Sequence, residues 1–169
     1  MPGLVEGEGQ YCSVLRKEGD DDFSHYGSKI KIPKDSFISH YFDIPVLPRR
    51  KGDLLMAVPE KIGSLIEAIE PLHPLRAGVS VGKMKGNTLV PDADLALAFL
   101  ANDAAFPIAE LDLHTALSFL HRDTFALPSS PKGYIKVSYK GIPLGFVKSL
   151  GNRCNNLHPQ ERRIRMNIN

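Results

Sequence analysis

The sequence has few cysteines and no long hydrophobic segment, and each absence excludes a class of protein. Cys12 and Cys154 are the two cysteines among 169 residues, and neither lies in a run of Cys and His at metal-ligand spacing. We therefore expect no disulfide framework and no zinc site. No apolar run approaches the roughly 20 residues of a membrane-spanning helix, and the N-terminus lacks the pattern of a signal peptide. These absences predict a cytoplasmic protein without a membrane partner.

Acidic residues are scarce at the C-terminal end of the chain. From Pro128 to Asn169 the sequence has eight lysines and arginines and one acid, Glu161, whereas the first 127 residues have 13 basic and 18 acidic residues. The formal charge of +2 is therefore the sum of +7 on this tail and −5 on the rest. Clustered cations attract polyanions, and phosphate contacts supply most non-specific affinity for nucleic acid. Function is expected in the tail.

The first half of the chain alternates weakly patterned and well patterned segments. Residues 10–15 predict a short strand, and residues 23–51, which contain three prolines, predict a linker with short local structure. The apolar run 54–58 predicts a buried strand, and residues 75–84 and 88–90 predict a hairpin. A helix is expected to begin at Pro59 and to end at Pro71. Its predicted core-facing stripe consists of Ile62, Leu65, Ile66 and Ile69.

Two aspartates are predicted to cap further helices. Asp92 precedes a segment with Leu95, Phe99 and Leu100, and Asp112 precedes one with Leu113, Leu117 and Leu120; both stripes are expected to face a core. On the second helix His114 and His121 are seven residues apart. They either share a face and bind a metal or titrate together, or have ordinary packed or exposed positions.

The basic tail has the pattern of a β unit. Ile135, Val137 and Tyr139 alternate with polar residues, Lys140-Gly141 is a turn signal, and residues 143–148 predict the returning strand. Residues 162–166 also have a strand-like pattern. The alternation puts Lys136 and Lys140 on a solvated face. Together these patterns predict an α+β protein that ends in a small antiparallel sheet or barrel.

The tail resembles a known RNA-binding domain. The segment Gly133-Tyr-Ile-Lys-Val-Ser-Tyr-Lys-Gly-Ile-Pro-Leu-Gly-Phe-Val-Lys148, then Gly151-Asn-Arg-Cys-Asn-Asn156, His158-Pro159 and Arg162-Arg-Ile-Arg165, is similar to the PUA-like domain that closes the RsmF (YebU) group of Sun-family rRNA cytosine-C5 methyltransferases. Residues 53–125 resemble the intermediate domain before it, and residues 6–17 resemble the end of the family's catalytic domain. The resemblance implies an intermediate α/β sub-domain followed by a PUA-like antiparallel β barrel. It divides the chain into residues 1–17, the remnant of the last methyltransferase strand; 18–52, a linker; 53–125, the intermediate domain; and 126–169, the PUA-like domain.

The chemistry of that family is not expected in this chain. The resemblance implies a cysteine nucleophile in a Pro-Cys or Thr-Cys context, but Cys12 follows Tyr11 and Cys154 follows Arg153. A methyl donor also needs a Gly-rich turn from strand to helix, whereas Gly7-x-Gly9 precedes a predicted strand. We therefore expect a C-terminal fragment that is inactive alone. S-adenosylmethionine would belong to the parent protein, and the missing methyltransferase domain would be a partner in cis.

The resemblance implies that the tail binds RNA, with rRNA or a ribosomal subunit as the partner. The predicted phosphate contacts are cationic, and arginine can also fork across two oxygens or stack on a base. The asparagines would contact sugars or bases, although Asn beside Gly151 is also typical of a tight turn. The candidate RNA-binding residues are Lys148, Asn152, Arg153, Asn155, Asn156, Arg162, Arg163 and Arg165.

Two alternatives to RNA binding remain open at this stage. Residues 53–169 would instead form a structural cap on the catalytic domain, with their cations paired to acids of that domain or of the acidic body. An autonomous small enzyme is the third hypothesis, but no nucleophile, base and orienting group can be assembled from the sequence.

Overall fold

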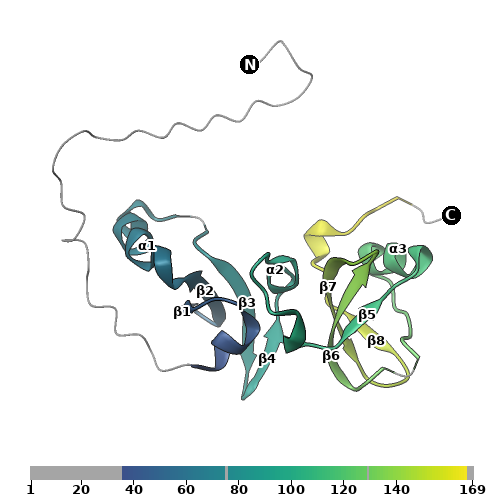
Figure 1. The fold of residues 1–169 in the computed structure, drawn as a ribbon. Helices are drawn as coiled ribbons and strands as arrows, with labels where there is room; N and C mark the ends of the chain where they lie inside the picture. The colour runs from purple at the N-terminus through teal and green to yellow at the C-terminus, as the bar shows by residue number, and fades with distance from the viewer. Residues whose placement is uncertain (1–35, 75, 129, 167–169) are drawn as a thin grey trace, which may run out of the picture.

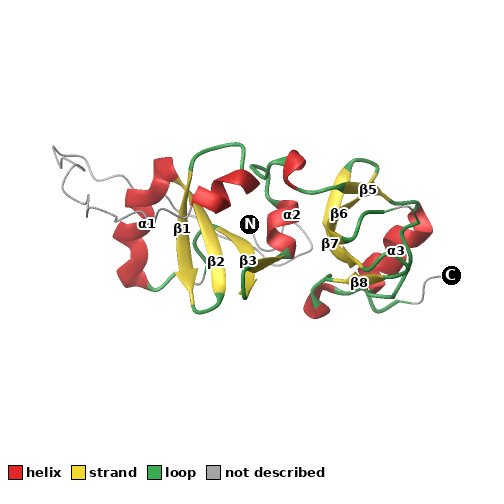
Figure 2. Ribbon diagram, turned by 90° about the horizontal axis from the view of Figure 1, so that it is seen from below, coloured by secondary structure: helices red, strands yellow, loops and turns green. Residues whose placement is uncertain are grey.

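The computed structural model describes residues 36–166 apart from residues 75 and 129. These residues form two four-stranded sheets with α2 between them, while α1 and α3 lie at opposite ends of the molecule (Figures 1 and 2). The predicted α+β class is confirmed. The predicted strand at residues 10–15 and the segment 1–17 lie outside the described residues.

The first sheet is antiparallel throughout, in the order β1-β2-β3-β4. Its strands are β1 (Val46–Lys51), β2 (Leu54–Pro59), β3 (Val79–Lys85) and β4 (Thr88–Pro91). Strand β2 and the β3–β4 hairpin confirm the predictions. The linker prediction was wrong for residues 46–51, which form β1. Its pattern is hidden because only its first two residues are buried, and Pro48 is tolerated because β1 is an edge strand.

The segment after β2 is helical but is not the predicted continuous, core-facing helix. A 3-10 helix (Glu60–Ile62), α1 (Gly63–Ile69) and a second 3-10 helix (Glu70–Leu72) follow one another. Ile66 is buried, whereas Ile62 and Leu65 are 40% and 51% exposed. The predicted stripe is therefore wrong in part, because the α-helical segment is only seven residues long and buries little more than one turn.

Both predicted aspartate caps are confirmed. The Asp92 carboxylate accepts a hydrogen bond from the Asp94 N–H at 2.9 Å at the start of α2 (Ala93–Leu97), and Asp112 accepts one from the Thr115 N–H at 2.7 Å at the start of α3 (Leu113–His121). The Thr115 bonds lower the pKa of Asp112. The predicted apolar stripes are only partly buried. Leu95 is buried, but α2 ends before Phe99, which is 99% exposed.

The second sheet has the order β5-β6-β7-β8. Its strands are β5 (Ile108–Glu110), β6 (Gly133–Tyr139), β7 (Ile142–Ser149) and β8 (Cys154–Asn156). The predicted β6–β7 hairpin is confirmed, and β5 adds a parallel edge strand. Within the described chain this sheet is open, with β5 and β8 at its edges, so barrel closure stays a prediction. The sheet starts upstream of residue 126, where the sequence placed the second domain.

The predicted last strand, residues 162–166, was wrong. A 3-10 helix (Gln160–Arg162) follows Pro159, and the Ile164 N–H donates to the Leu120 carbonyl at 3.1 Å. The segment therefore runs against the end of α3 and adds no strand to the sheet.

Strand β7 contributes to both hydrophobic cores. Val147 lies with Phe119 of α3 in the core of the second sheet. Phe146, on the opposite face of β7, belongs to the core of the first sheet and contacts Phe106 at a ring-centroid distance of 4.8 Å. Helix α2 packs against both β3 and β7. The two sheets therefore share a buried core and are not linked by an open tether.

Candidate nucleic-acid interface

Three side chains form a row across the second sheet. Tyr134 of β6 pairs with Lys148 of β7, which pairs with Asn155 of β8. Residues that are directly opposite on neighbouring strands point to the same face. The Lys148 ammonium lies 5.5 Å from the centroid of the Tyr134 ring, a cation–π distance. We refer to Tyr134, Lys148 and Asn155 as the β6–β8 row.

The alternation of β6 and β7 fixes the direction of this row. Ile135 and Val147 are buried in the core under α3, so their neighbours along each strand must point to the other face. On that other face Phe146 is buried against the first sheet, and Lys148 follows two residues later. The row therefore lies on the same face as Phe146; its Tyr134 and Lys148 are half-buried, and its Asn155 is exposed.

The turn between β7 and β8 adds two exposed candidate residues beside the row. Asn152 and Arg153 are exposed, and the Leu150 N–H donates to the Arg153 carbonyl at 2.9 Å. Gly151 has a φ of 99°, a conformation that favours glycine. A Cβ atom at Gly151 would lie 3.4 Å from Cε of Lys132, so the Lys132 side chain lies against this turn.

Lys132 and Tyr134 were missed as candidate site residues. The charge count included Lys132, and the predicted hairpin contained Tyr134, but neither signal places them beside Lys148 and Arg153. The sequence from residue 124 to 160 contains no Asp or Glu. Lys132, Lys148 and Arg153 therefore form a local excess of positive charge at one end of the sheet.

The Asn156 side chain is hydrogen-bonded within the protein, whereas Asn152 and Asn155 are exposed. Its amide donates to the carbonyls of Phe119 and Asp123 at 2.9 and 3.1 Å, and its oxygen accepts from the His158 N–H at 2.9 Å. Both amide hydrogens are thus used within the protein, where they join β8 to the end of α3. This geometry argues against the predicted contact of Asn156 with RNA.

The three predicted arginines beyond residue 160 are not part of the row. Arg162 donates to Asp94 of α2 at 2.8 Å, and this carboxylate raises the pKa of Arg162. Its charge is therefore paired within the protein, and the bond connects the C-terminal segment to α2, which packs against the first sheet. Arg163 and Arg165 follow as exposed residues.

The two lysines predicted on a solvated face differ in their exposure to solvent. Lys140 is exposed in the β6–β7 turn, as predicted. Lys136 is 3% exposed, and its ammonium donates to Asp103, so its prediction was wrong. It lies on the sheet face that packs toward the first unit, and its partner comes from the segment between the two sheets.

Among the described residues, His121 lies in no larger group of metal-ligating side chains. His121 contacts Asp123 at 2.9 Å, and no group of three or more metal-ligating side chains occurs in the part of the chain that the structure covers. Cys154 is a free thiol, 1% exposed. Among the helices described, none is long and apolar enough to cross a membrane.

The comparison with known families concerns this second sheet. Residues 106–164 match the family model of the methyltransferase RsmF PUA domain. The matched span contains β5–β8, α3 and the turn with Arg153. No curated protein matches the chain. The part of the chain that carries the β6–β8 row is therefore similar to the PUA domain of the methyltransferase RsmF.

Proposed function

We propose that this chain is the RNA-binding C-terminal module of an S-adenosylmethionine-dependent rRNA (cytosine-C5) methyltransferase and that it positions the substrate RNA. The observation that carries the proposal is the place of the β6–β8 row and the Arg153 turn inside the span that matches the RsmF PUA domain. The partner would be rRNA or a ribosomal subunit in the cytoplasm. Methyl transfer and its cofactor would belong to a methyltransferase domain in cis.

The chemistry of the row and the turn suits a polynucleotide. The ammonium of Lys148 and the guanidinium of Arg153 would neutralise backbone phosphates, and a guanidinium can donate to two oxygens at once. Asn152 and Asn155 present exposed amides that can donate to and accept from sugar hydroxyls or base edges. Arg163 and Arg165 are also exposed and would add phosphate contacts from outside the row.

The test is a binding measurement with the full chain and a fluorescently labelled structured rRNA fragment over a series of salt concentrations. The double variant Lys148→Gln/Arg153→Gln should reduce the slope of log K against log salt by about 1.4 to 1.8, because each lost phosphate contact contributes roughly 0.7 to 0.9. The matched control is Lys61→Gln/Lys140→Gln, which removes the same charge at two other exposed positions. Equal slopes for the two double variants would contradict the proposal.

One observation favours the structural cap as a second function. Ile62, Leu65 and Leu72 in and around α1 are 40%, 51% and 78% exposed, an apolar surface of the kind that packs on another domain. A tight complex with the separately expressed catalytic domain, weakened by Leu65→Ser, together with no RNA affinity of this chain, would favour the cap over RNA binding.

A further inference from the structure

The strands of the first sheet are basic although they lie in the acidic part of the chain. Residues 1–127 have a net charge of −5, but β1, β2, β3 and β4 contain no Asp or Glu. Their charged residues are all cations: Arg49, Arg50, Lys51, Lys83 and Lys85.

Strand register places four of these cations on one face of the sheet. Lys51 pairs with Leu54, and Leu54 pairs with Lys83, so the two lysines flank Leu54. Two strand spacings separate them, about 10 Å. Arg49 and Lys85 are each two residues away along β1 and β3, and therefore share that face. We refer to Arg49, Lys51, Lys83 and Lys85 as the basic sheet face.

The opposite face of the sheet is the core face. Leu55, Ala57 and Leu89 point there and are buried with Leu95 of α2. The cations cannot exchange faces with these residues, because a shift of one residue would expose the core. Lys51, Lys83 and Lys85 are exposed, so their charges are available to a ligand.

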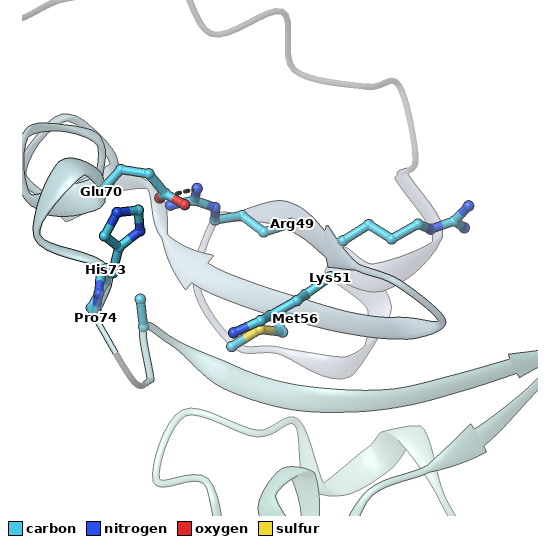
Figure 3. A pocket seen from close by; sticks show the side chains of 8 residues that line it. Arg49, Lys51, Met56, Glu70, His73 and Pro74 are labelled. Atoms are coloured by element: carbon cyan, nitrogen blue, oxygen red, sulfur yellow. Dashed lines mark hydrogen bonds and ion pairs between the residues drawn. The ribbon is translucent and has the colours of Figure 1, made fainter.

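A cavity of about 310 Å³ lies where the basic sheet face meets the segment after α1. Its lining includes Arg49, Lys51, Met56, Glu70 and His73 (Figure 3). The close-up shows Arg49 and Glu70 directed at each other, with Lys51 and Met56 extending from the strands and His73 beside Glu70. The cavity is thus lined by the cationic strand β1 and by Met56 of β2 on one side, and by the end of a helical segment on the other.

Glu70 holds one arginine of this site, and the lining stays net positive. Glu70 accepts a hydrogen bond from the Arg49 guanidinium, which fixes the guanidinium and leaves other N–H groups for a ligand. It is the one carboxylate in the described lining, against Arg49, Arg50 and Lys51. His73 has a φ of 50°, a left-handed conformation that ends the 3-10 helix and turns its ring toward the cavity.

We propose that the basic sheet face and its cavity bind phosphates of an RNA backbone, as a second contact separate from the β6–β8 row. Cations spaced about 10 Å apart across an open sheet suit a repeating chain of phosphates. The core that the two sheets share through Phe146 holds the two basic surfaces in one body. A single RNA chain that reaches both gains affinity, because its second contact forms at high effective concentration.

The experiment uses the full chain and a labelled single-stranded RNA of about 20 nucleotides at salt concentrations from about 50 to 300 mM. The double variant Lys51→Gln/Lys83→Gln should weaken binding about 10- to 30-fold at 100 mM salt and reduce the log–log slope by about 1.4. Lys51→Arg/Lys83→Arg should bind like the parent chain, and so should the control Lys61→Gln/Lys140→Gln.

A gain of affinity gives a measurement that misfolding cannot imitate. Glu70→Gln removes the carboxylate from the cavity lining and should strengthen RNA binding about 3- to 5-fold at low salt. The matched control is Glu60→Gln, an exposed change at the other end of the same helical segment. Equal binding by Glu70→Gln and Glu60→Gln, together with an unchanged slope for Lys51→Gln/Lys83→Gln, would overturn the inference.

The same data separate this inference from the proposed function. If only Lys148→Gln/Arg153→Gln weakens binding, the second contact is wrong and the proposed function stands. If only Lys51→Gln/Lys83→Gln weakens it, the proposed role of the second sheet is wrong. A titration with inorganic phosphate tests whether the site binds a small anion instead of RNA. If millimolar phosphate shifts the NMR signals of His73 and RNA does not compete with it, the site is one for a small anion and the polynucleotide proposal fails.

Discussion

Lys136 is a buried cation of the basic tail, and we expect its charge to affect the stability of the fold instead of binding phosphate. This lysine is 3% exposed on β6 and donates to Asp103, whose side chain is 77% exposed. Removing one partner of a buried ion pair costs about 3–5 kcal/mol, whereas exposed pairs contribute about 0.2–1 kcal/mol. Because one partner here is buried and the other exposed, we expect Asp103→Asn to lower the free energy of unfolding by about 2 kcal/mol.

The lysine itself should be replaceable. Lys136→Met keeps an unbranched stem in the buried position and removes the charge that needs Asp103, so we expect a change within about 1 kcal/mol. Urea unfolding followed by circular dichroism measures both variants, and a loss of about 2 kcal/mol corresponds to roughly 4–8 °C in Tm for a chain of this size. The double variant Asp103→Asn/Lys136→Met should recover most of the stability that Asp103→Asn loses.

Two outcomes would refute this reasoning. A cost below about 0.5 kcal/mol for Asp103→Asn would mean that the Lys136 charge finds solvent without its partner. Additive effects in the double variant would mean that the two side chains act independently. RNA binding gives a further check: Lys136→Met should leave the salt slope unchanged, since a buried ammonium reaches no phosphate.

The remaining predictions concern the shared core and the β6–β7 turn. Phe146→Ala should cost about 3–5 kcal/mol in urea unfolding and should separate one transition into two, because Phe146 lies on β7 of the second sheet but packs in the core of the first, where it contacts Phe106; a single transition with a small loss would contradict this. Glu110 accepts hydrogen bonds from Ser138 and Gly141, which lower the pKa of this carboxyl below its usual value. At a pH between its folded and unfolded pKa, this carboxyl binds fewer protons in the folded state than in the unfolded state. Its contribution to stability is therefore present above its usual pKa and is lost as the pH falls through the lowered, folded-state pKa. Glu110→Gln should flatten that dependence in acid titrations, and an unchanged acid limb would argue against it.

Local signals explain which parts of the fold could be predicted. The alternation of Ile135 and Val137 with polar residues predicts β6, and Asp92 and Asp112 predict two helix starts because a cap is satisfied within three residues. Strand β1 was missed because its second half, Arg49-Arg50-Lys51, consists of consecutive cations without alternation. Its pairing with β2 also depends on burial that the sequence does not show.

Non-local contacts explain what could not be predicted in the candidate site. Lys136 is buried on the face that packs toward the first sheet, and its ammonium is paired with Asp103, 33 residues earlier. Asn156 was assigned to RNA because Asn suits a turn or a base edge, but its amide is satisfied by Phe119 and Asp123 of another element. Charge alone does not reveal such partners, and Lys148 and Arg153 can be told from Lys136 only once register and burial are known.

Strand pairing in the first sheet also changes how the charge of the acidic part of the chain should be interpreted. A net charge of −5 over residues 1–127 suggests that this part repels phosphate, yet the acids lie outside β1–β4, and four of the five cations in these strands lie on one face of the sheet. Phosphate affinity depends on local potential, which falls off within about 10 Å at 0.1 M salt. A ligand at Lys51 and Lys83 therefore experiences mainly the basic sheet face. For this protein the spatial distribution of charge, and not the charge of each half, determines where a polyanion can bind.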